Sequence, residues 1–330
     1  MTETNFVNNK KKKENTMFKD YFKYYKSRNP PPKLDDVIDI DSACKKVIQV
    51  DVKDVDNTKT FIVDKWGLKA TSTWKIYKFT DIPGLIFIRN PFTSIGQRYW
   101  ITKCLRDYSR KPNKLNIDAH DIIDDQENWW SIYKSDNEKS KNIVGKLRWA
   151  TLGYHHNWDT KYYSENDKSP VPYELNEMTK LLSNYLGFNN FNAEAAIVNY
   201  YRMNSTLAGH VDHSENNMDA PLFSISFGQT AIFLIGGLSQ QEPAYPIYIK
   251  SGDVIVMSGE SRLRYHGVPK ILRDENLNWK QDNPDEANIF VDSDDWNKAS
   301  DYIDDARINI NIRQVLKIGQ TSLTDNYHSN

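Results

Sequence analysis

The order of apolar and polar positions predicts helices mainly in the first half of the chain. Residues 97–109 predict one helix, and residues 172–186 predict an amphipathic helix that begins at a proline. An apolar run at residues 85–88 follows a Pro-Gly turn and indicates a buried strand. A further short helix, ended by prolines at positions 30–32, is predicted by an aromatic stripe that we expect to dock on the body: Phe18, Tyr21, Phe22 and Tyr25.

After position 195 the pattern changes to short apolar or alternating runs, which predict strands. These runs span residues 197–202, 223–235, 245–250, 254–257 and 306–316. The turn Ser251-Gly252-Asp253 is predicted to join two of them as a hairpin. Residues 118–140 predict a long polar loop with a helical piece, and residues 274–305 an acidic, loop-like insertion. The pattern therefore predicts an α+β protein with a two-sheet jelly roll in its C-terminal half.

Composition narrows the class of protein and its compartment. The 330 residues are 39% hydrophobic and carry a net charge of -1, so a globular chain without a global basic field is expected. The two cysteines, Cys44 and Cys104, form no CxxC motif and indicate reduced thiols. No run is long and apolar enough to span a membrane, and no secretion signal is recognisable. We expect an intracellular monomer in the nucleus or cytoplasm, with the mitochondrion as a further candidate.

Two basic tracts leave their roles open. The run Lys10 to Lys13 lies in a predicted disordered basic tail, residues 1–16, which is either a solvated tail or a nuclear address or phosphate-binding arm. The second tract lies on and just after the helix predicted at 97–109, and is either a solvated helix face or a phosphate-binding patch. Its members are Arg98, Lys103, Arg106, Arg110, Lys111 and Lys114.

Three residues have the chemistry of a non-haem iron site. On an extended segment, His210 and Asp212 point to the same face, so an imidazole and a carboxylate can grip one metal. A later histidine, His266, completes two histidines and one carboxylate, the facial triad of iron(II) that leaves positions open for a cosubstrate and oxygen. An HxD triplet alone is usually a surface loop, and the chain has seven histidines.

The last predicted strand adds a second signal, because polar and isoleucine residues alternate along it. Its polar face carries Arg307, Asn309, Asn311 and Arg313. This face is either the solvated side of an ordinary strand or a clamp for a dicarboxylate, since guanidinium groups bind carboxylates bidentately. Asn199 and Tyr201, on one face of another predicted strand, could add an amide and a phenol to the same ligand.

Together, the motifs NxY, HxD, a distant histidine and RxNxxxR resemble those of the AlkB dioxygenases. The homologue-1 branch of that family is the most similar, through residues 147–158, 199–202, 226–229, 234–237, 251–253 and 256–259. The resemblance runs from about residue 18 to residue 316 and is weakest at 118–140 and 274–305. Several independent motifs in the same order make this resemblance specific.

The resemblance implies a fold, a cofactor set and a site. The fold is a double-stranded β-helix over residues 195–318, preceded at 17–194 by N-terminal helices and a nucleotide-recognition lid, and followed by a tail at 319–330. Iron(II) would be bound by His210, Asp212 and His266, with oxygen as co-reactant. The cosubstrate 2-oxoglutarate would be held by Asn199, Tyr201, Arg307, Asn309 and Arg313. The lid would comprise Trp149, Tyr154, His156, Asn157 and Trp158, for which core packing is the competing interpretation.

The activity implied by the resemblance is oxidative demethylation of a nucleic-acid base, with release of formaldehyde and succinate. A base in a regular duplex cannot reach such a site, so unpaired or bulged DNA and structured RNA are favoured. Both 6-methyladenine in DNA and methylated bases of tRNA are candidates. Two other classes stay open: a 2-oxoglutarate oxygenase that acts on protein side chains, and a catalytically silent nucleic-acid binder. The intact triad argues against the silent binder.

Overall fold

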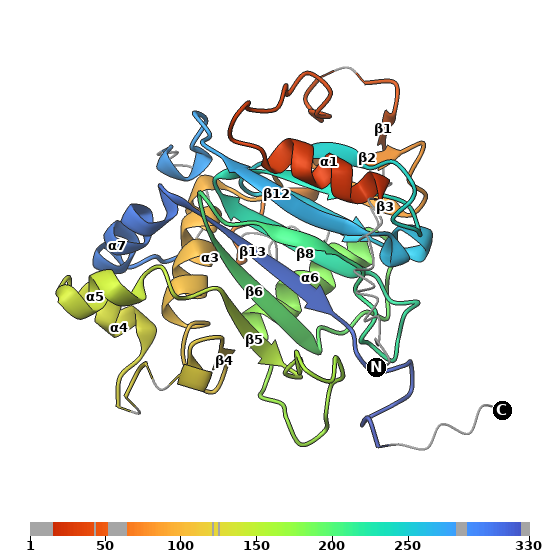
Figure 1. The fold of residues 1–330 in the computed structure, drawn as a ribbon. Helices are drawn as coiled ribbons and strands as arrows, with labels where there is room; N and C mark the ends of the chain where they lie inside the picture. The colour runs from red at the N-terminus through yellow and green to blue at the C-terminus, as the bar shows by residue number, and fades with distance from the viewer. Residues whose placement is uncertain are drawn as a thin grey trace, which may run out of the picture.

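Two antiparallel sheets form the centre of the computed structural model, which describes residues 16–42, 44–51, 65–120, 122–124, 126–281 and 289–324 (Figure 1). The larger sheet has the order β1 (Val47–Val50), β2 (Lys75–Phe79), β3 (Leu85–Arg89), β11 (Val254–Met257), β8 (Leu222–Gly228), β13 (Ala306–Arg313), β6 (Ala195–Arg202), β5 (Trp149–Gly153) and β4 (Lys114–Leu115). The smaller sheet has the order β10 (Tyr245–Ile249), β9 (Thr230–Ile235), β12 (His266–Leu272) and β7 (Leu207–His210). The predicted jelly roll is confirmed.

Apart from the β9–β10 hairpin, consecutive strands of the C-terminal half alternate between the two sheets. The run predicted at 223–235 is two strands, β8 and β9, which belong to different sheets. Likewise β10 pairs with β9, whereas β11 pairs with β3 and β8. The prediction that Ser251-Gly252-Asp253 joins a hairpin is therefore wrong, because this turn crosses from one sheet to the other. Gly252 has a φ of 84°, and a Cβ there would lie 2.0 Å from Asn90 Oδ1, so the crossing requires glycine.

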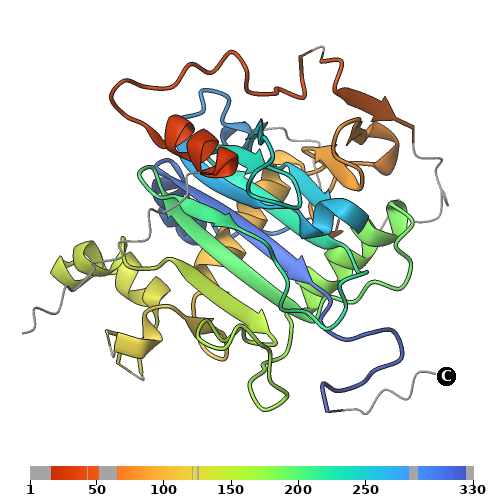
Figure 2. The same ribbon diagram turned by 45° about the vertical axis from the view of Figure 1, so that its right-hand side comes forward.

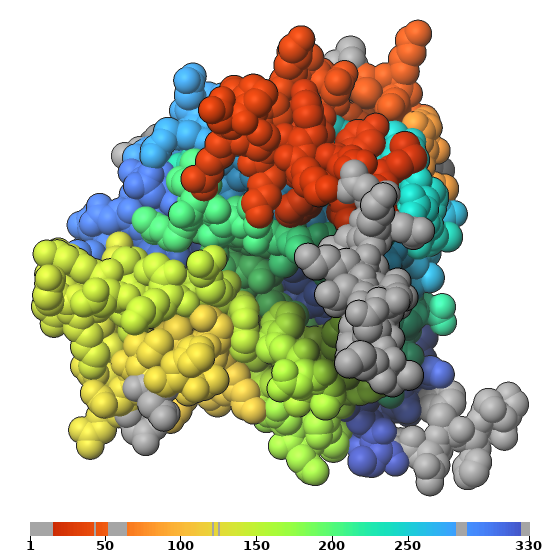
Figure 3. Space-filling view, in the orientation of Figure 1, coloured from red at the N-terminus to blue at the C-terminus, as the bar shows by residue number. Residues whose placement is uncertain are grey.

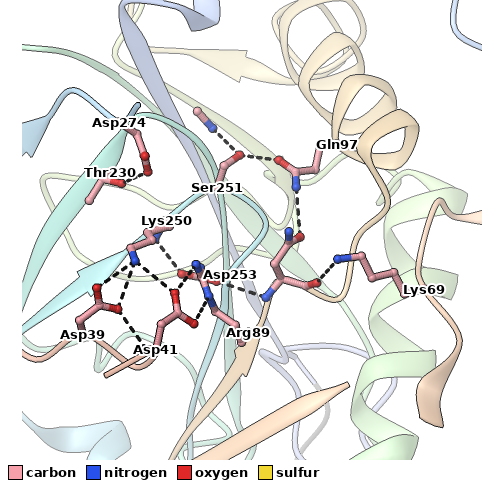
Figure 4. A network of polar contacts seen from close by, with 12 residues as sticks. Asp39, Asp41, Lys69, Arg89, Gln97, Thr230, Lys250, Ser251, Asp253 and Asp274 are labelled. Carbon is pink, nitrogen blue, oxygen red and sulfur yellow. Dashed lines mark hydrogen bonds and ion pairs between the residues drawn. The ribbon is translucent and has the colours of Figure 1, made fainter. Parts of the chain in front are cut away.

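A polar network fixes this corner of the jelly roll (Figure 4). Buried Asp253 accepts a hydrogen bond from Arg89 Nη1 at 2.7 Å, and Arg89 also pairs with Asp41 at 2.8 Å. The Ser251 hydroxyl donates to Gln97 Oε1 at 2.6 Å. These contacts join the turn to β3, to the helix that follows β3 and to the segment before β1. The N-terminal half is thus attached to the jelly roll by buried polar contacts as well as by strand pairing.

Helices cover the outer face of the larger sheet. They are α3 (Ser94–Arg106), α6 (Tyr173–Tyr185) and α7 (Ser293–Ile303), and their apolar side chains form one core with the three isoleucines of β13. Beside α7 lie α4 (Trp129–Lys134) and α5 (Glu138–Ile143), which make a lobe at the edge of the molecule (Figures 1 and 3). Short 3₁₀ turns are η2 (Thr71–Thr73), η3 (Asp118–His120), η4 (Gly259–Leu263) and η5 (Asn278–Lys280).

The first helix, α1 (Met17–Lys26), crosses the outer face of the smaller sheet beside β12 (Figure 2). Phe18 and Tyr25 are buried there against Ile232 and Leu234 of β9, which confirms the predicted docking of the aromatic stripe. Both sheets therefore have a covered outer face, and the space between them is left for a site.

Within the part of the chain that the structure describes, no helix is long and apolar enough to cross a membrane.

Two regions contain more regular structure than their sequences indicated. Residues 274–305 were expected to be loop-like, but α7 lies within them and buries Ala299, Tyr302 and Ile303. Residues 17–194 were expected to supply mainly helices, and they also contribute β1 to β5 to the larger sheet. The 97–109 helix is observed at Ser94–Arg106 and the 172–186 helix at Tyr173–Tyr185. Most of the tail at 1–16, with Lys10 to Lys13, lies outside the described residues.

Candidate functional site

The three predicted metal ligands meet at one end of the space between the sheets. His210 closes β7 and His266 opens β12, and the two residues are paired in register across these strands. Asp212 follows two residues after His210, and its carboxylate lies 3.7 Å from His210 Nε2 and 3.6 Å from His266 Nε2. All three ligand atoms lie within 4.8 Å of one another. Among the described residues, these three form the one cluster of His, Cys, Asp or Glu side chains that could hold a metal ion.

Hydrogen bonds and charge prepare these side chains for a cation. Each histidine donates from Nδ1 to a backbone carbonyl, of Ala208 at 2.9 Å and of Arg264 at 3.1 Å, which leaves Nε2 free to coordinate. Burial, helped by His210, lowers the pKa of His266 to about 4. Burial alone would raise the pKa of Asp212. Arg313, followed by the two histidines, outweighs this effect and holds the pKa well below its usual value. Neutral imidazoles and an ionised carboxylate are the donors that iron(II) takes.

The polar face of β13 is turned into the space between the sheets, so the solvated-strand interpretation is wrong. Arg307 is 3% exposed, and Asn309 and Arg313 are each 4% exposed, whereas the isoleucines on the other face pack under the helices. A cavity runs along this face from the metal ligands inward. Its polar lining consists of Tyr201, His210, Ser224, His266, Arg307, Asn309 and Asn311.

Arg307, at the inner part of this cavity, has unused hydrogen-bonding capacity. Its Nη2 donates to Ser226 Oγ at 2.8 Å, and its guanidinium lies 5.0 Å from the centroid of the Tyr201 ring. Its Nε and Nη1 are buried and have no hydrogen-bond partner among the described residues. Leaving buried cationic donors unpaired is costly, so the arrangement fits a carboxylate ligand. The donor set of this cavity therefore fits 2-oxoglutarate.

The five predicted cosubstrate residues fall into two groups. Tyr201, Arg307 and Asn309 line the inner cavity, where Asn309 Nδ2 also donates to Ser224 Oγ on β8 at 2.8 Å. Asn199 and Arg313 instead line a second, outer pocket, which His210 and Asp212 also line. The two cavities share His210, so a ligand in either one would reach the metal position.

One wall of the outer pocket comes from the predicted lid. Trp158 is 47% exposed, and its ring lies 4.7 Å from that of His156 and 5.1 Å from that of Trp149, measured between centroids. His156 and Trp158 line the pocket. Trp149 contacts the Trp158 ring but does not line the pocket. The sequence did not single out other members of the lining, among them Lys161, Tyr163, Leu238, Leu263 and Tyr265. The continuing aromatic character beyond Trp158 was the available signal for Tyr163.

Two predicted lid residues have a structural role. Tyr154 is 5% exposed, packs with Ala195 and Val315, and donates from its hydroxyl to Glu165 at 2.7 Å. The Asn157 side chain accepts hydrogen bonds from the backbone N–H groups of residues 159 and 160, both at 3.0 Å, which forms a turn. Neither lines the outer pocket. The position of Tyr154 matches the competing interpretation, in which it packs in the core.

The basic tract around α3 is largely neutralised, both by Asp107 within the tract and by acids from elsewhere in the chain. Lys103, Arg106 and Arg110 share Asp107, and Arg106 also pairs with Asp295 at 3.0 Å. Lys103 further contacts Glu174, Lys114 contacts Asp167, and Arg98 donates to the carbonyls of Trp279 and Gln281. These cations hold α3 to its neighbours, which removes the main reason to assign them to phosphates.

Comparison with known proteins agrees with this geometry. A profile of the 2OG-Fe(II) oxygenase superfamily matches residues 84–313. The human protein named nucleic acid dioxygenase ALKBH1 is 37% identical over 92% of this chain and 85% of its own length. Schizosaccharomyces pombe tRNA demethylase abh1 is 32% identical over 73% of this chain and 82% of its own, and Arabidopsis thaliana DNA N(6)-methyladenine demethylase ALKBH1A is 32% identical over 73% and 77%. The chain therefore belongs to the 2OG-Fe(II) oxygenase superfamily, in the homologue-1 branch of the AlkB family.

Proposed function

We propose that this chain is an iron(II)- and 2-oxoglutarate-dependent dioxygenase that removes methyl groups from bases of nucleic acid. One observation carries the proposal: the triad of His210, Asp212 and His266 lies where an inner cavity lined by Arg307 meets an outer pocket lined by Trp158. Relatives of the same branch are named for acting on nucleic acid, tRNA and DNA containing N6-methyladenine. The intact triad supports an enzyme rather than a silent binder.

In this assignment the triad holds iron(II), and Arg307 and Tyr201 hold the distal carboxylate of 2-oxoglutarate. Bound iron, cosubstrate and oxygen supply the oxidation that turns an N-methyl group into formaldehyde and leaves succinate, carbon dioxide and the bare base. The protein contributes position and a dry interior. Arg307 would anchor the cosubstrate, Arg313 keeps Asp212 ionised, and the burial of Arg307 and Asn309 would limit the access of water to the inner cavity.

The outer pocket supports a base that has left its stack. Trp158, His156, Tyr265 and Leu263 line the pocket, so aromatic and apolar side chains are available to a base. Aromatic rings stabilise an unstacked base by roughly 1–3 kcal/mol. His210 and Asp212 line this pocket, and a base stacked inside a regular duplex cannot reach a metal held there. Single-stranded or bulged DNA with 6-methyladenine and methylated tRNA are therefore the proposed substrates.

A substrate panel tests this function. The iron-loaded protein is incubated with 2-oxoglutarate and methylated DNA or RNA, each single-stranded, bulged and duplex, and nucleosides are measured by mass spectrometry. We expect demethylation with stoichiometric formaldehyde, fastest for unpaired substrates and absent in an Asp212→Ala variant. Formaldehyde release or hydroxylation with peptides and none with any oligonucleotide would instead identify a protein oxygenase.

A further inference from the structure

A closed ring of three ion pairs and one hydrogen bond includes Asp212, the carboxylate of the proposed iron site. Asp212 Oδ2 accepts from Arg313 Nη2 at 3.0 Å, and Arg313 Nε contacts Glu215 Oε1 at 3.0 Å. Glu215 Oε2 accepts from Arg262 Nη2 at 2.7 Å, and Arg262 Nη1 returns to the backbone carbonyl of Asp212 at 2.7 Å. Both the carboxylate and the main chain of Asp212 are thus held by one network that includes Glu215.

This ring is buried and electrically balanced. The side chains of Glu215 and Arg262 are each 2% exposed, and that of Arg313 is 4% exposed. Two carboxylates face two guanidinium groups, so removing one charge would leave another uncompensated in a dry environment. Such a cluster is costly unless its geometry is maintained, and it surrounds only one of the three metal ligands. This energetic cost indicates that the ring fixes the position of the Asp212 carboxylate.

The ring is joined to the wall of the outer pocket by Tyr163. The Tyr163 hydroxyl donates to Glu215 Oε1 at 3.1 Å, the same oxygen that faces Arg313. Burial, opposed by Arg313 and reinforced by Glu215, raises the pKa of Tyr163, so the hydroxyl keeps its proton and acts as a donor. The ring of Tyr163 lies 5.4 Å from that of His156, which in turn contacts Trp158. A continuous set of contacts therefore leads from the exposed tryptophan to Glu215.

We propose that Glu215 is a positioning residue that couples occupancy of the outer pocket to metal binding at Asp212, through Tyr163 on one side and Arg313 on the other. The inference rests on the proposed function, in which the outer pocket takes the nucleic-acid base. Glu215 draws the Nε side of Arg313 toward itself, so Arg313 meets Asp212 through one nitrogen only. Without Glu215, Arg313 could pair bidentately with Asp212 and compete with the metal for both carboxylate oxygens.

Coupling between two sites is reciprocal and can be measured without turnover. The affinity of the protein for a methylated single-stranded oligonucleotide is determined by fluorescence anisotropy with and without Mn(II). For the wild type we expect Mn(II) to tighten binding by about 5-fold or more. Tyr163→Phe, which removes only the hydroxyl, should reduce this factor to near unity. The matched control is Tyr154→Phe, because its hydroxyl bonds Glu165 in the same segment and does not reach the ring. An Asp212→Ala protein corrects for effects of Mn(II) on the oligonucleotide.

Equal Mn(II) effects in the wild type, Tyr163→Phe and Tyr154→Phe would overturn the coupling. A wild type whose oligonucleotide affinity does not change with Mn(II) would also overturn it.

The effect of Glu215 on metal binding is tested on the protein alone, without oligonucleotide, by Mn(II) calorimetry. Glu215→Gln should weaken Mn(II) binding about 10-fold, as loss of residues that orient metal ligands commonly does, and Glu165→Gln should not. Unchanged Mn(II) affinity in Glu215→Gln would refute the role of Glu215. A wild type that binds no oligonucleotide would instead contradict the proposed function, while the calorimetry still decides the role of Glu215.

Discussion

Replacing Arg307 by lysine tests the cosubstrate site through a change that keeps the charge. In the wild type, Nε and Nη1 of Arg307 are buried without partners among the described residues, so the planar guanidinium fork has free donors for a carboxylate ligand. A lysine ammonium is a point donor on a flexible stem and cannot reproduce that fork. At least one charge-assisted hydrogen bond is then lost, at a cost of about 1.5–3 kcal/mol. The expected result is 2-oxoglutarate binding that is weaker by roughly 10- to 150-fold.

The assay is calorimetry with Mn(II)-loaded protein under anaerobic conditions. A matched ligand separates the Arg307 contact from general damage: 2-oxobutyrate has the metal-binding oxo acid group but lacks the distal carboxylate. Arg307→Lys should bind 2-oxobutyrate as the wild type does, because the lost contact is absent from both complexes. Equal 2-oxoglutarate affinity in wild type and variant would refute the assignment. Equal weakening for both ligands would show a distorted cavity rather than a lost carboxylate contact.

Five further substitutions test the remaining assignments. Asp212→Ala should abolish Mn(II) binding and turnover, and near-normal activity with bound iron would contradict the triad. Trp158→Ala should raise the Michaelis constant for nucleic acid, by a factor equivalent to roughly 1–3 kcal/mol, with little change in melting temperature because the ring is half exposed; Tyr154→Ala should do the reverse. Arg106→Ala should lower the melting temperature and leave the salt dependence of nucleic-acid binding unchanged, and a flatter salt slope would restore the phosphate interpretation. Burial raises the pKa of Asp295, but hydrogen bonds from its cationic partners outweigh this effect and hold the pKa below its ordinary 3.8. The wild type should therefore be more stable than Asp295→Asn at pH 7, and this difference in the free energy of unfolding should shrink as the pH falls below 3.8. Urea unfolding at several pH values measures it.

The elements that the sequence predicted correctly are those whose own residues carry the information. The stripe from Phe18 to Tyr25 and the apolar face of α6 have helical spacing, and the alternation in β13 has the period of a strand with two different faces. Metal ligands two residues apart on one segment could also be recognised locally. Each of these patterns is complete within about a dozen residues, so tertiary structure was not needed to interpret it.

What the sequence could not show depends on partners far along the chain. The acids that neutralise the α3 cations include Glu174 and Asp295, which lie about 70 and 190 residues away from their partners, so the helix looked free to bind phosphate. The turn at residues 251–253 has the composition of a hairpin, and only strand pairing shows that it crosses between sheets. Tyr154 and Trp158 are both aromatic residues of one segment, and burial alone separates their roles.

The burial of charge on β13 is itself evidence for a ligand. A sheet packed against another sheet normally fills the space between them with apolar side chains, yet here Arg307, Asn309 and Arg313 occupy it. Arg313 is matched by Asp212 and Glu215, but Arg307 has no acidic partner among the contacts of the structure. A buried guanidinium without an acidic partner destabilises the fold. A dicarboxylate that binds beside it should therefore stabilise the protein more than the same ligand would at a solvated site. Addition of 2-oxoglutarate with Mn(II) is therefore expected to raise the melting temperature of the wild type, and the rise should be much smaller in Arg307→Lys at equal ligand concentration. Equal rises in both proteins would place the carboxylate elsewhere in the cavity.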